Sequence, residues 1–208
     1  MITYKNGDKY EGEVKDDKPH GYGTLTYHSG DVYEGEYLNG ERNGKGKRTF
    51  ANGDIFEGEF KNDMRNGIGK KWYKNGDYYE GEYLDGLRNG YGFEKMANGE
   101  EFEGHFREGK RHGKGVKKFA NGDIFEGQYR DGKSCGQCFK KFVNGDYFEG
   151  MFNNGKRNGK GLMKFANGSS FEGEFKDGKK HGRGINKYPN GESFEGEFLN
   201  DERNGKGC

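Results

Sequence analysis

The chain has 208 residues and a net charge of +1, which arises from 36 basic and 35 acidic residues. Only 28% of the residues are hydrophobic and 34% are charged, and this composition excludes a thick globular core. The balanced charge gives no reason to expect nucleic acid as a partner, and no apolar run is long enough for a membrane-spanning helix. No signal-peptide pattern follows Met1, so we expect a cytoplasmic protein.

A 23-residue repeat accounts for the whole sequence. The tripeptide aromatic-Glu-Gly recurs nine times without insertion or deletion, and its aromatic residue is numbered here as position 0 of each repeat. All 41 glycines fall at positions +2, +7, +11, +13 and +20. We therefore expect residues 1–208 to form a single array. Its repeats begin at Tyr10, Tyr33, Phe56, Tyr79, Phe102, Phe125, Phe148, Phe171 and Phe194.

Each repeat predicts two β-strands. Aromatic residues at 0 and +4 alternate with polar ones, which is typical of a strand, and a second strand is expected over +11 to +17. Segments such as Ala51-Asn52-Gly53 between repeats are typical of tight hairpin turns. We expect +2 to pair with +13, +4 with +11 of its own repeat, and +15 with the next position 0. The predicted fold is an all-β, elongated, single-layer antiparallel meander of tandem β-hairpins.

This register gives the predicted sheet two unlike faces. One carries a stripe of glycines at +2 and +13, bordered by the aromatic residues at 0 and +4. The other carries Glu at +1 in all nine repeats and Lys at +16 in repeats four to eight. We interpret the second face as solvated, with charges that neutralise one another.

Segments such as Tyr33-Glu-Gly-Glu-Tyr37 followed by Thr49-Phe50-Ala-Asn-Gly53 resemble MORN repeats, and the resemblance covers essentially the whole chain. The usual Trp at +4 is replaced by Tyr, Phe or Val14. The resemblance implies a scaffold in a cytoskeletal, ciliary or membrane-apposed assembly, and it implies contact with phospholipids, which has been proposed for such repeats. No catalytic domain accompanies the repeats, so we expect no enzymatic activity.

The motif Cys135-Gly-Gln-Cys138 has the spacing of a redox or metal site. Both cysteines occupy repeat positions, +10 and +13, and no second pair or histidine that could complete a zinc site is near in sequence. We interpret the pair as structural, with a metal or redox role as the alternative. No Ser-His-Asp set or distinctive carboxylate pair stands out, so we expect no catalytic residues, no metal and no cofactor.

We expect the glycine stripe to form the floor of a groove for a protein partner, with the +4 aromatics as one wall. Cys138 should then project into this floor. The occupant would be an extended segment or an amphipathic helix. The alternative is that the rings cover one another and the glycines. The predicted groove residues are Tyr37, Phe60, Tyr83, Phe106, Tyr129, Phe152, Phe175, Gly81, Gly92, Gly104 and Gly115.

A basic row at +9 predicts a second kind of surface. One cation per repeat along an edge could contact anionic phospholipid headgroups, and this makes a peripheral membrane adaptor the alternative function. Solvated turn charges are the other interpretation of this row. The row consists of Arg42, Arg65, Arg88, Arg111, Arg157, Lys180 and Arg203.

Two further features predict contacts with partners. Residues 205–208 supply only part of a second strand for repeat nine, so we expect the edge there to pair with a partner or with a second copy. Position +3 is Glu in six repeats but His105, Gln128 and Met151 in repeats five to seven. We expect these three residues to discriminate between partners.

Overall fold

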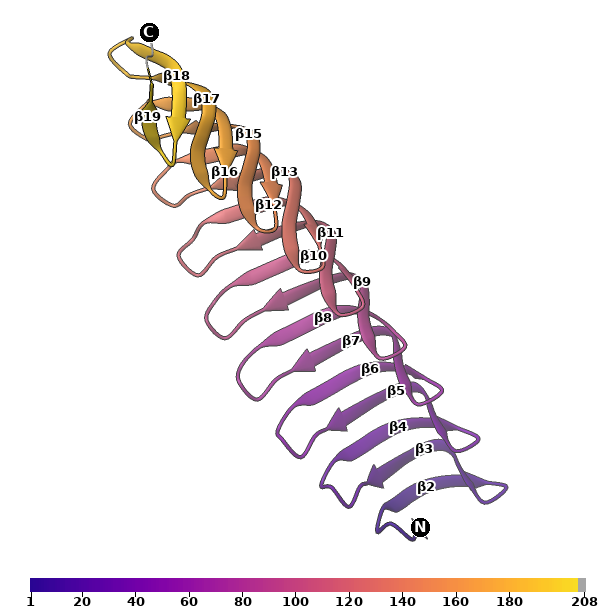
Figure 1. Ribbon diagram of the computed structural model, residues 1–208. Coiled ribbons are helices and arrows are strands. Elements are labelled where there is room, and N and C mark those ends of the chain that lie inside the picture. Colours follow the sequence, from indigo (N-terminus) through magenta and orange to yellow (C-terminus); the bar gives the residue numbers. More distant parts are fainter. Residues whose placement is uncertain (206–208) are drawn as a thin grey trace. The chain divides into compact units, whose positions relative to one another are not determined.

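The computed structural model describes residues 1–205, which form nineteen β-strands and no helix (Figure 1). The chain divides into two compact units, Met1–Gly99 with Phe106–Gly109, and Glu100–His105 with Lys110–Cys208. The first unit contains β1 (Ile2–Thr3), β2 (Lys9–Lys15), β3 (Lys18–Thr26), β4 (Val32–Leu38), β5 (Glu41–Thr49), β6 (Ile55–Lys61), β7 (Met64–Trp72), β8 (Tyr78–Leu84) and β9 (Leu87–Lys95). β10 (Glu101–Arg107) contributes residues to both units. The second unit continues with β11 (Lys110–Lys118), β12 (Ile124–Arg130), β13 (Lys133–Lys141), β14 (Tyr147–Asn153), β15 (Lys156–Lys164), β16 (Ser170–Lys176), β17 (Lys179–Lys187), β18 (Ser193–Leu199) and β19 (Glu202–Asn204).

Within each unit, consecutive strands pair antiparallel, which confirms the predicted all-β meander of tandem hairpins. The predicted pairing of the glycine stripe is also confirmed. Gly46 at +13 lies opposite Gly35 of its own repeat and opposite Gly58 of the next. Arg48 at +15 lies opposite Phe56, the next position 0, as expected.

The predicted pairing of +4 with +11 inside one repeat is wrong. Tyr37 at +4 instead lies opposite Arg42 at +9, and the register shifts between Gly35 and Tyr37. Gly44 at +11 pairs with Phe60, the +4 residue of the next repeat. This shift is a β-bulge, and Gly44 adopts a φ of 105° within it, which a residue with a side chain rarely adopts. The second strand consequently covers +8 to +16, earlier than the predicted +11 to +17.

The second strand of repeat nine also starts earlier than predicted. β19 (Glu202–Asn204) pairs with β18 and starts before the predicted second strand, while the last three residues of that prediction, through Cys208, lie outside the described residues.

The aromatic residues at 0 and +4 form the core of each unit. Tyr33 contacts Tyr37 of its own repeat edge to face, at 5.3 Å between ring centroids, and Phe60 of the next repeat at 5.0 Å. The same two contacts recur from repeat to repeat within each unit, so the position 0 rings of Phe56, Tyr79, Phe125, Phe148 and Phe171 each lie between two rings at +4. The rings of Tyr10 and Phe194 each contact one such ring. T-shaped pairs of this kind contribute about 0.5–1.5 kcal/mol each beyond the area they bury. One layer of rings therefore joins each repeat to the next.

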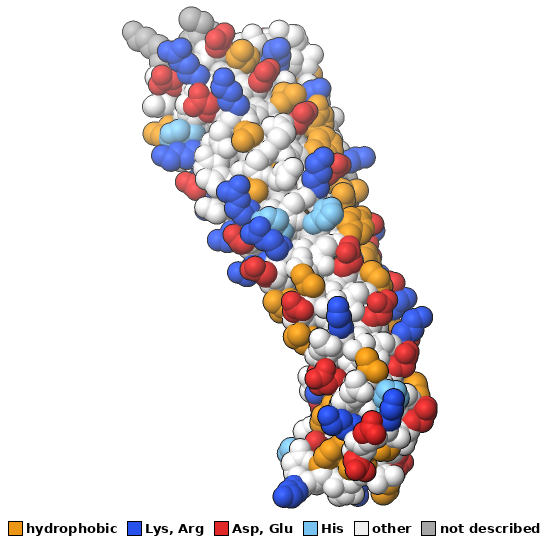
Figure 2. Space-filling model, turned by 90° about the vertical axis from the view of Figure 1, so that its right-hand side faces the viewer, with side chains coloured by type: hydrophobic (Ala, Val, Ile, Leu, Met, Phe, Trp, Pro, Cys, Tyr) orange, Lys and Arg blue, Asp and Glu red, His pale blue; other side chains and the backbone are white. Residues whose placement is uncertain are grey.

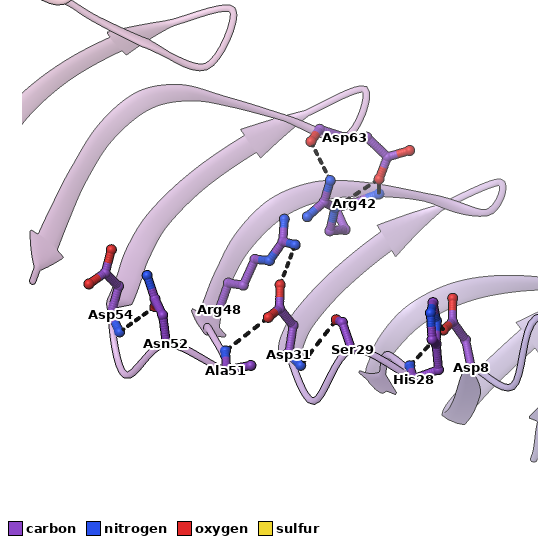
Figure 3. Close-up of polar contacts among 10 residues, drawn as sticks. All are labelled: Asp8, His28, Ser29, Asp31, Arg42, Arg48, Ala51, Asn52, Asp54 and Asp63. Carbon is purple, nitrogen blue, oxygen red and sulfur yellow. Dashed lines mark hydrogen bonds and ion pairs between the residues drawn. The ribbon is translucent and has the colours of Figure 1, made fainter. Parts of the chain in front are cut away.

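A second ladder joins the turns between repeats (Figure 3). The carboxylate of Asp31 at +21 accepts a hydrogen bond from the backbone N–H of Ala51, at 2.9 Å, and the carboxylate of Asp8 accepts one from His28, at 2.8 Å. Asp54 accepts the corresponding N–H of Lys74. The same pattern recurs at Asp77, Asp123 and Asp146. In these six pairs of turns, the backbone N–H of one turn thus has its acceptor supplied by the turn before it.

Candidate binding groove

The aromatic residues predicted to wall a groove are buried in the core. Tyr37, Tyr83 and Phe175 expose 5%, 4% and 3% of their surface, and Phe152 is half-buried. Phe60, Phe106 and Tyr129 are likewise buried. These rings cover one another, which was the alternative interpretation of the sequence, and this leaves little of their surface for a partner.

The predicted glycine floor is also filled on its aromatic side. A Cβ placed on Gly92 would lie 2.5 Å from the hydroxyl oxygen of Tyr79, and one on Gly81 would lie 2.6 Å from that oxygen. In the second unit, a Cβ on Gly115 would lie 2.5 Å from Cζ of Phe102, and Gly104 lies under the same ring. The expectation of an open groove on the aromatic face is therefore wrong, because the ring at position 0 lies across the glycine pair of its own repeat.

The open groove lies on the opposite face of the same glycines. In the first unit it has a volume of about 480 Å³, and the backbone of Gly46, Gly58 and Gly69 forms its floor. Glu34 and Glu57 at +1 lie along it. Its other lining residues are Tyr22, Glu36, Lys45, Lys47, Glu59, Ile68 and Lys70. The backbone of these glycines thus forms the floor of a groove on the charged face, whereas the sequence predicted a groove on the aromatic face.

A larger groove of about 750 Å³ lies on the corresponding face of the second unit. Its floor is the backbone of Gly150, Gly161, Gly173 and Gly184. The side chains around it come from +1, +3, +12 and +14. They are Gln137, Glu149, Lys160, Leu162, Glu172, Glu174, Arg183, Ile185 and Glu195. Four carboxylates and two cations therefore face this groove.

The sequence interpretation missed the +12 and +14 residues as lining because it treated this face as a neutral, solvated one. The sequence signal that could have identified these lining positions is the presence of large apolar residues at +12 on a face that is otherwise charged. Tyr22, Ile68 and Tyr91 at +12 expose 59%, 52% and 48% of their surface, although most of their neighbours are charged. Figure 2 shows one face of the molecule, on which basic and acidic side chains are interspersed and hydrophobic side chains gather along one margin.

Glu at +3 stabilises the bulge beside the groove. The carboxylate of Glu36 accepts a hydrogen bond from the backbone N–H of Lys45 at 3.1 Å, and Glu82 accepts one from Tyr91 at 2.7 Å. Glu13 and Tyr22 repeat this contact. Gln128 and Met151 replace this carboxylate in repeats six and seven, and there their side chains lie beside the bulge glycines, Gly136 and Gly159. His105 lies in the same way beside Gly113.

The carboxylates at +1 differ in their neighbours. Glu80 in the first unit accepts a hydrogen bond from the Tyr78 hydroxyl at 2.6 Å and lies 3.1 Å from the Lys70 ammonium group. The Tyr78 hydroxyl, more than Lys70, lowers the pKa of Glu80. This carboxylate stays ionised and partly neutralised at physiological pH.

The basic row at +9 covers the core instead of forming an exposed edge. The guanidinium of Arg42 lies 5.5 Å from the ring centroid of Tyr33 and 5.3 Å from that of Phe60, and its side chain is 12% exposed. Arg65, Arg88, Arg111, Arg157 and Lys180 are half-buried over rings in the same way, and Arg203 lies over Phe194 but is exposed. Burial lowers the pKa of Lys180. The prediction of a solvent-facing, lipid-binding row does not match this placement.

These cations also tie one repeat to the next. Arg65 donates a hydrogen bond to the carbonyl of Gly86 at 2.6 Å, and Arg157 donates one to Gly178 at 2.5 Å. Arg42 donates a hydrogen bond to the backbone carbonyl of Asp63 and also pairs with the carboxylate of the same residue (Figure 3). The half-buried cations of this row therefore stabilise the contacts between repeats.

The two cysteines do not form a site in the groove. Cys138 is 3% exposed, and its sulfur lies on the aromatic side, against Gly127 and the ring of Phe125. Burial raises the pKa of the Cys138 thiol to about 11, and Cys135 is a half-buried free thiol. The expectation that Cys138 projects into the groove is wrong, because its side chain takes the space that position 0 rings fill elsewhere. Among residues 1–205 no group of three or more His, Cys, Asp or Glu side chains is placed to hold a metal ion.

The part of the chain that the structure describes contains no helix that is long and apolar enough to cross a membrane.

A family model described as "MORN repeat" matches the chain in nine consecutive segments, 10–32, 33–55, 56–78, 79–101, 102–124, 125–147, 148–170, 171–193 and 194–208. These segments begin at the nine predicted repeat starts. No curated protein matches the chain.

Three solved structures have a similar fold. The TCP10 domain of Danio rerio CPAP in complex with a peptide of Danio rerio STIL has a TM-score of 0.55 at 12% identity, over 92% of this chain and 84% of that one. The same domain without the peptide has a TM-score of 0.52 at 12% identity, over 94% and 92% of the two chains. The CPAP G-box domain, described with a role in centriole elongation, has a TM-score of 0.51 at 13% identity, over 85% and 93%. At these identities the likeness extends to the fold alone.

Proposed function

Because the chain belongs to the MORN-repeat family, we propose that it is a non-enzymatic scaffold that holds an extended segment of a partner protein in its glycine-floored grooves. The observation that carries this proposal is the groove on the charged face of each unit, with glycine backbone as its floor. On this face positions +2 and +13 present only backbone, because a side chain there would point to the aromatic side, and the main chain of a partner can therefore approach the floor. The cytoskeletal or ciliary setting belongs to the same proposal and follows from the family.

Side chains of several kinds line the grooves, and this favours a peptide over a small molecule. Carboxylates recur in successive repeats along the floor, and cations and apolar side chains alternate between them, so a long and narrow ligand would meet similar contacts repeatedly. A domain of similar fold, from Danio rerio CPAP, is in complex with a peptide, which supports a peptide as the ligand of such a sheet.

The test is a selection of peptides on the full chain. Peptides of about fifteen residues from a random displayed library, long enough to cross several strands of the sheet, are selected on the immobilised protein, and their affinities are measured by fluorescence anisotropy. The groove variant is Glu149→Arg with Glu172→Arg, and the matched control is Lys176→Glu, an exposed residue of β16 outside the groove lining. We expect selected peptides to lose at least about tenfold in affinity for the groove variant and little for the control.

Failure to enrich any peptide, or equal affinity for all three proteins, would overturn the proposal. The membrane alternative is tested beside it with phosphatidylcholine vesicles that contain phosphatidylserine. Since most of the +9 cations lie over rings, we expect no co-sedimentation with these vesicles. Salt-sensitive co-sedimentation would support the membrane adaptor instead.

An association between the ends of two copies is a separate part of the proposal. Light scattering after size-exclusion chromatography, at several protein concentrations, measures it directly. A mass that rises with concentration supports the association, and a constant monomer mass contradicts it.

A further inference from the structure

We infer that the groove of the second unit takes an extended basic segment in which one apolar and one basic residue recur every three residues. The inference rests on the proposed function and specifies the chemistry of the partner. It is carried by one row of side chains, of which Glu149, Leu162, Glu172, Ile185 and Glu195 line the groove and the others continue the row beyond it.

This row alternates between apolar and acidic residues from strand to strand. Phe139 at +14 of repeat six lies directly opposite Glu126 and Glu149, the carboxylates at +1 on the two neighbouring strands. Leu162 lies opposite Glu149 and Glu172 in the same way. Ile185 lies opposite Glu172 and Glu195, and Val116 begins the row opposite Glu126. Phe139, Leu162 and Ile185 thus each lie between two carboxylates, one on either neighbouring strand.

The side chains of this row are open to a ligand. Val116 and Phe139 expose 42% and 39% of their surface, and Leu162 and Ile185 are half-buried. The four carboxylates, Glu126, Glu149, Glu172 and Glu195, are exposed. A segment that covered the row would remove apolar area from water and would bring its cations beside these carboxylates.

The first unit repeats this arrangement only at Phe93, which lies opposite Glu80, because lysines occupy +14 in repeats two and three. Lys47 at +14 lies opposite Glu34 and Glu57, and Lys70 lies opposite Glu57 and Glu80. Glu57 therefore has a lysine on both sides, and Glu34 and Glu80 have one each, whereas the four carboxylates of the second unit have apolar cross-strand neighbours. The attraction for a basic segment is concentrated in the second unit.

Other charges on this face restrict where the basic residues of the segment can lie. Lys160 and Arg183 at +12 line one side of the row, with Glu174 beside them. Lys164 and Lys187 at +16 lie on the other side, opposite Ser170 and Ser193. Lys160 and Arg183 lie directly opposite Glu174 and Glu197, so the charges at that margin are balanced, whereas the carboxylates of the middle row have no cation opposite them among the described residues. Cations of the segment would therefore be attracted chiefly along the middle row.

The spacing of the row selects the period of the segment. Neighbouring strands lie about 4.8 Å apart, so successive apolar side chains of the row are about 9.6 Å apart. Three residues of a polyproline II segment advance about 9.3 Å and complete one turn, so every third side chain points the same way. In an extended β-strand, residues three apart point to opposite faces, so a β-strand does not present every third side chain to the row. Seven residues of an α-helix advance about 10.5 Å, which drifts out of step about three times as fast. A segment with a three-residue period matches the row.

Three synthetic peptides test the inference on the full chain by fluorescence anisotropy. The first contains Arg-Pro-Leu four times, the second has the same composition in an order without a three-residue period, and the third has Glu in place of Arg. We expect the first to bind at least about tenfold more tightly than either of the others. Equal affinity for the reordered peptide would overturn the period, and equal affinity for the acidic peptide would overturn the charge.

Two matched double variants locate the site. Glu149→Gln with Glu172→Gln should weaken the Arg-Pro-Leu peptide at least about tenfold, and Glu34→Gln with Glu57→Gln in the first unit should leave it unchanged. An equal loss in both would overturn the assignment to the second unit. If library-selected peptides compete for the groove but are neither basic nor three-residue periodic, this inference fails while the proposed function stands. If no peptide of either kind binds, both fail.

Discussion

The carboxylate of Asp31 accepts a hydrogen bond from the backbone N–H of Ala51, 20 residues further along the chain, at 2.9 Å. The guanidinium of Arg48 lies 2.6 Å from the other oxygen of the same carboxylate, and its own position is fixed over the rings of Tyr27 and Phe50. One carboxylate therefore joins a turn, a cation and two aromatic rings that come from two repeats. Asp8 makes the corresponding bond to His28.

This contact predicts that the protein loses stability in acid. The Ala51 N–H foremost, and then Arg48, lower the pKa of Asp31 below its ordinary value of 3.8, and the His28 N–H does the same for Asp8. A folded-state pKa below the unfolded one contributes stability that is present above pH 3.8 and is lost as the pH falls through the folded-state value. We expect the thermal midpoint to be flat near neutrality and to fall steeply below pH 3.8.

Circular dichroism melts across this range measure the effect. Asp31→Asn should lower the midpoint near neutral pH and flatten its dependence on acid, whereas Glu11→Gln on the exposed face should change neither. A variant that keeps the full acid dependence of the wild type would contradict the assignment to Asp31.

In repeat four, removal of the hydroxyl group should have opposite effects on stability at its two core tyrosines. The Tyr83 hydroxyl is buried without a hydrogen-bond partner, and burial raises the pKa of Tyr83 to about 12. The Tyr79 hydroxyl donates to the carbonyl of Glu82 at 3.3 Å. We expect Tyr83→Phe to raise the free energy of unfolding by up to about 1 kcal/mol and Tyr79→Phe to lower it by about 0.5–1.5 kcal/mol. Urea denaturation measures both, and a loss of stability in Tyr83→Phe would show that its hydroxyl has a partner.

Restoring the missing carboxylate at +3 should stabilise repeat seven. Met151 lies beside the bulge glycine Gly159, where Glu36 and Glu82 accept a backbone N–H in their repeats. We expect Met151→Glu to raise the free energy of unfolding by about 0.5–1.5 kcal/mol, and Glu36→Met to lower it by a similar amount. Denaturation by urea again provides the measurement. If Met151→Glu is neutral while Glu36→Met is destabilising, the bulge of repeat seven does not require the acceptor.

The stripe glycines should not tolerate side chains. A Cβ on Gly92 would lie 2.5 Å from the hydroxyl oxygen of Tyr79, so that ring must move out of the core. We expect Gly92→Ala to lower the free energy of unfolding by about 1–3 kcal/mol. Gly92→Ala combined with Tyr79→Phe removes the nearest atom and should recover part of this loss. A stable Gly92→Ala protein would mean that the ring at position 0 is free to reorient.

The two central cysteines should differ in reactivity. Cys138 is 3% exposed and its pKa is raised to about 11, so little thiolate is present at pH 8. We expect iodoacetamide to alkylate the half-buried Cys135 in the folded protein and to reach Cys138 only in urea, as peptide mapping by mass spectrometry would show. Alkylation of both at equal rates would contradict the burial of Cys138.

The sequence predicted the parts of the fold that repeat with period two. The pairing of Gly46 with Gly35 follows from glycine spacing and hairpin length, and it is confirmed. The bulge at Gly44 was missed because an alternating pattern contains no extra residue, although glycine at +11 in every repeat, with Glu at +3 in six, was its signal.

The candidate site was harder to predict, because the groove lies on the face that sequence reasoning set aside. Alternation distinguishes the two faces of the sheet, but it does not show that the ring of Tyr79 is long enough to lie across Gly81 and Gly92. Nor does a cation at +9 indicate whether its side chain extends into water or lies over the aromatic core. Arg42 folds back because the rings of Tyr33 and Phe60 offer it a surface.

The contacts between rings also bear on how such a protein could evolve. The ring of Tyr33 packs against the +4 ring of its own repeat and that of the next, Tyr37 and Phe60. A gene duplication or deletion of 23 codons, or of a multiple of 23, would therefore leave every remaining repeat with the neighbours it needs, whereas other lengths would break the register of the rings. With a footprint of three ligand residues per repeat, one such event would lengthen or shorten the recognised segment by a tripeptide.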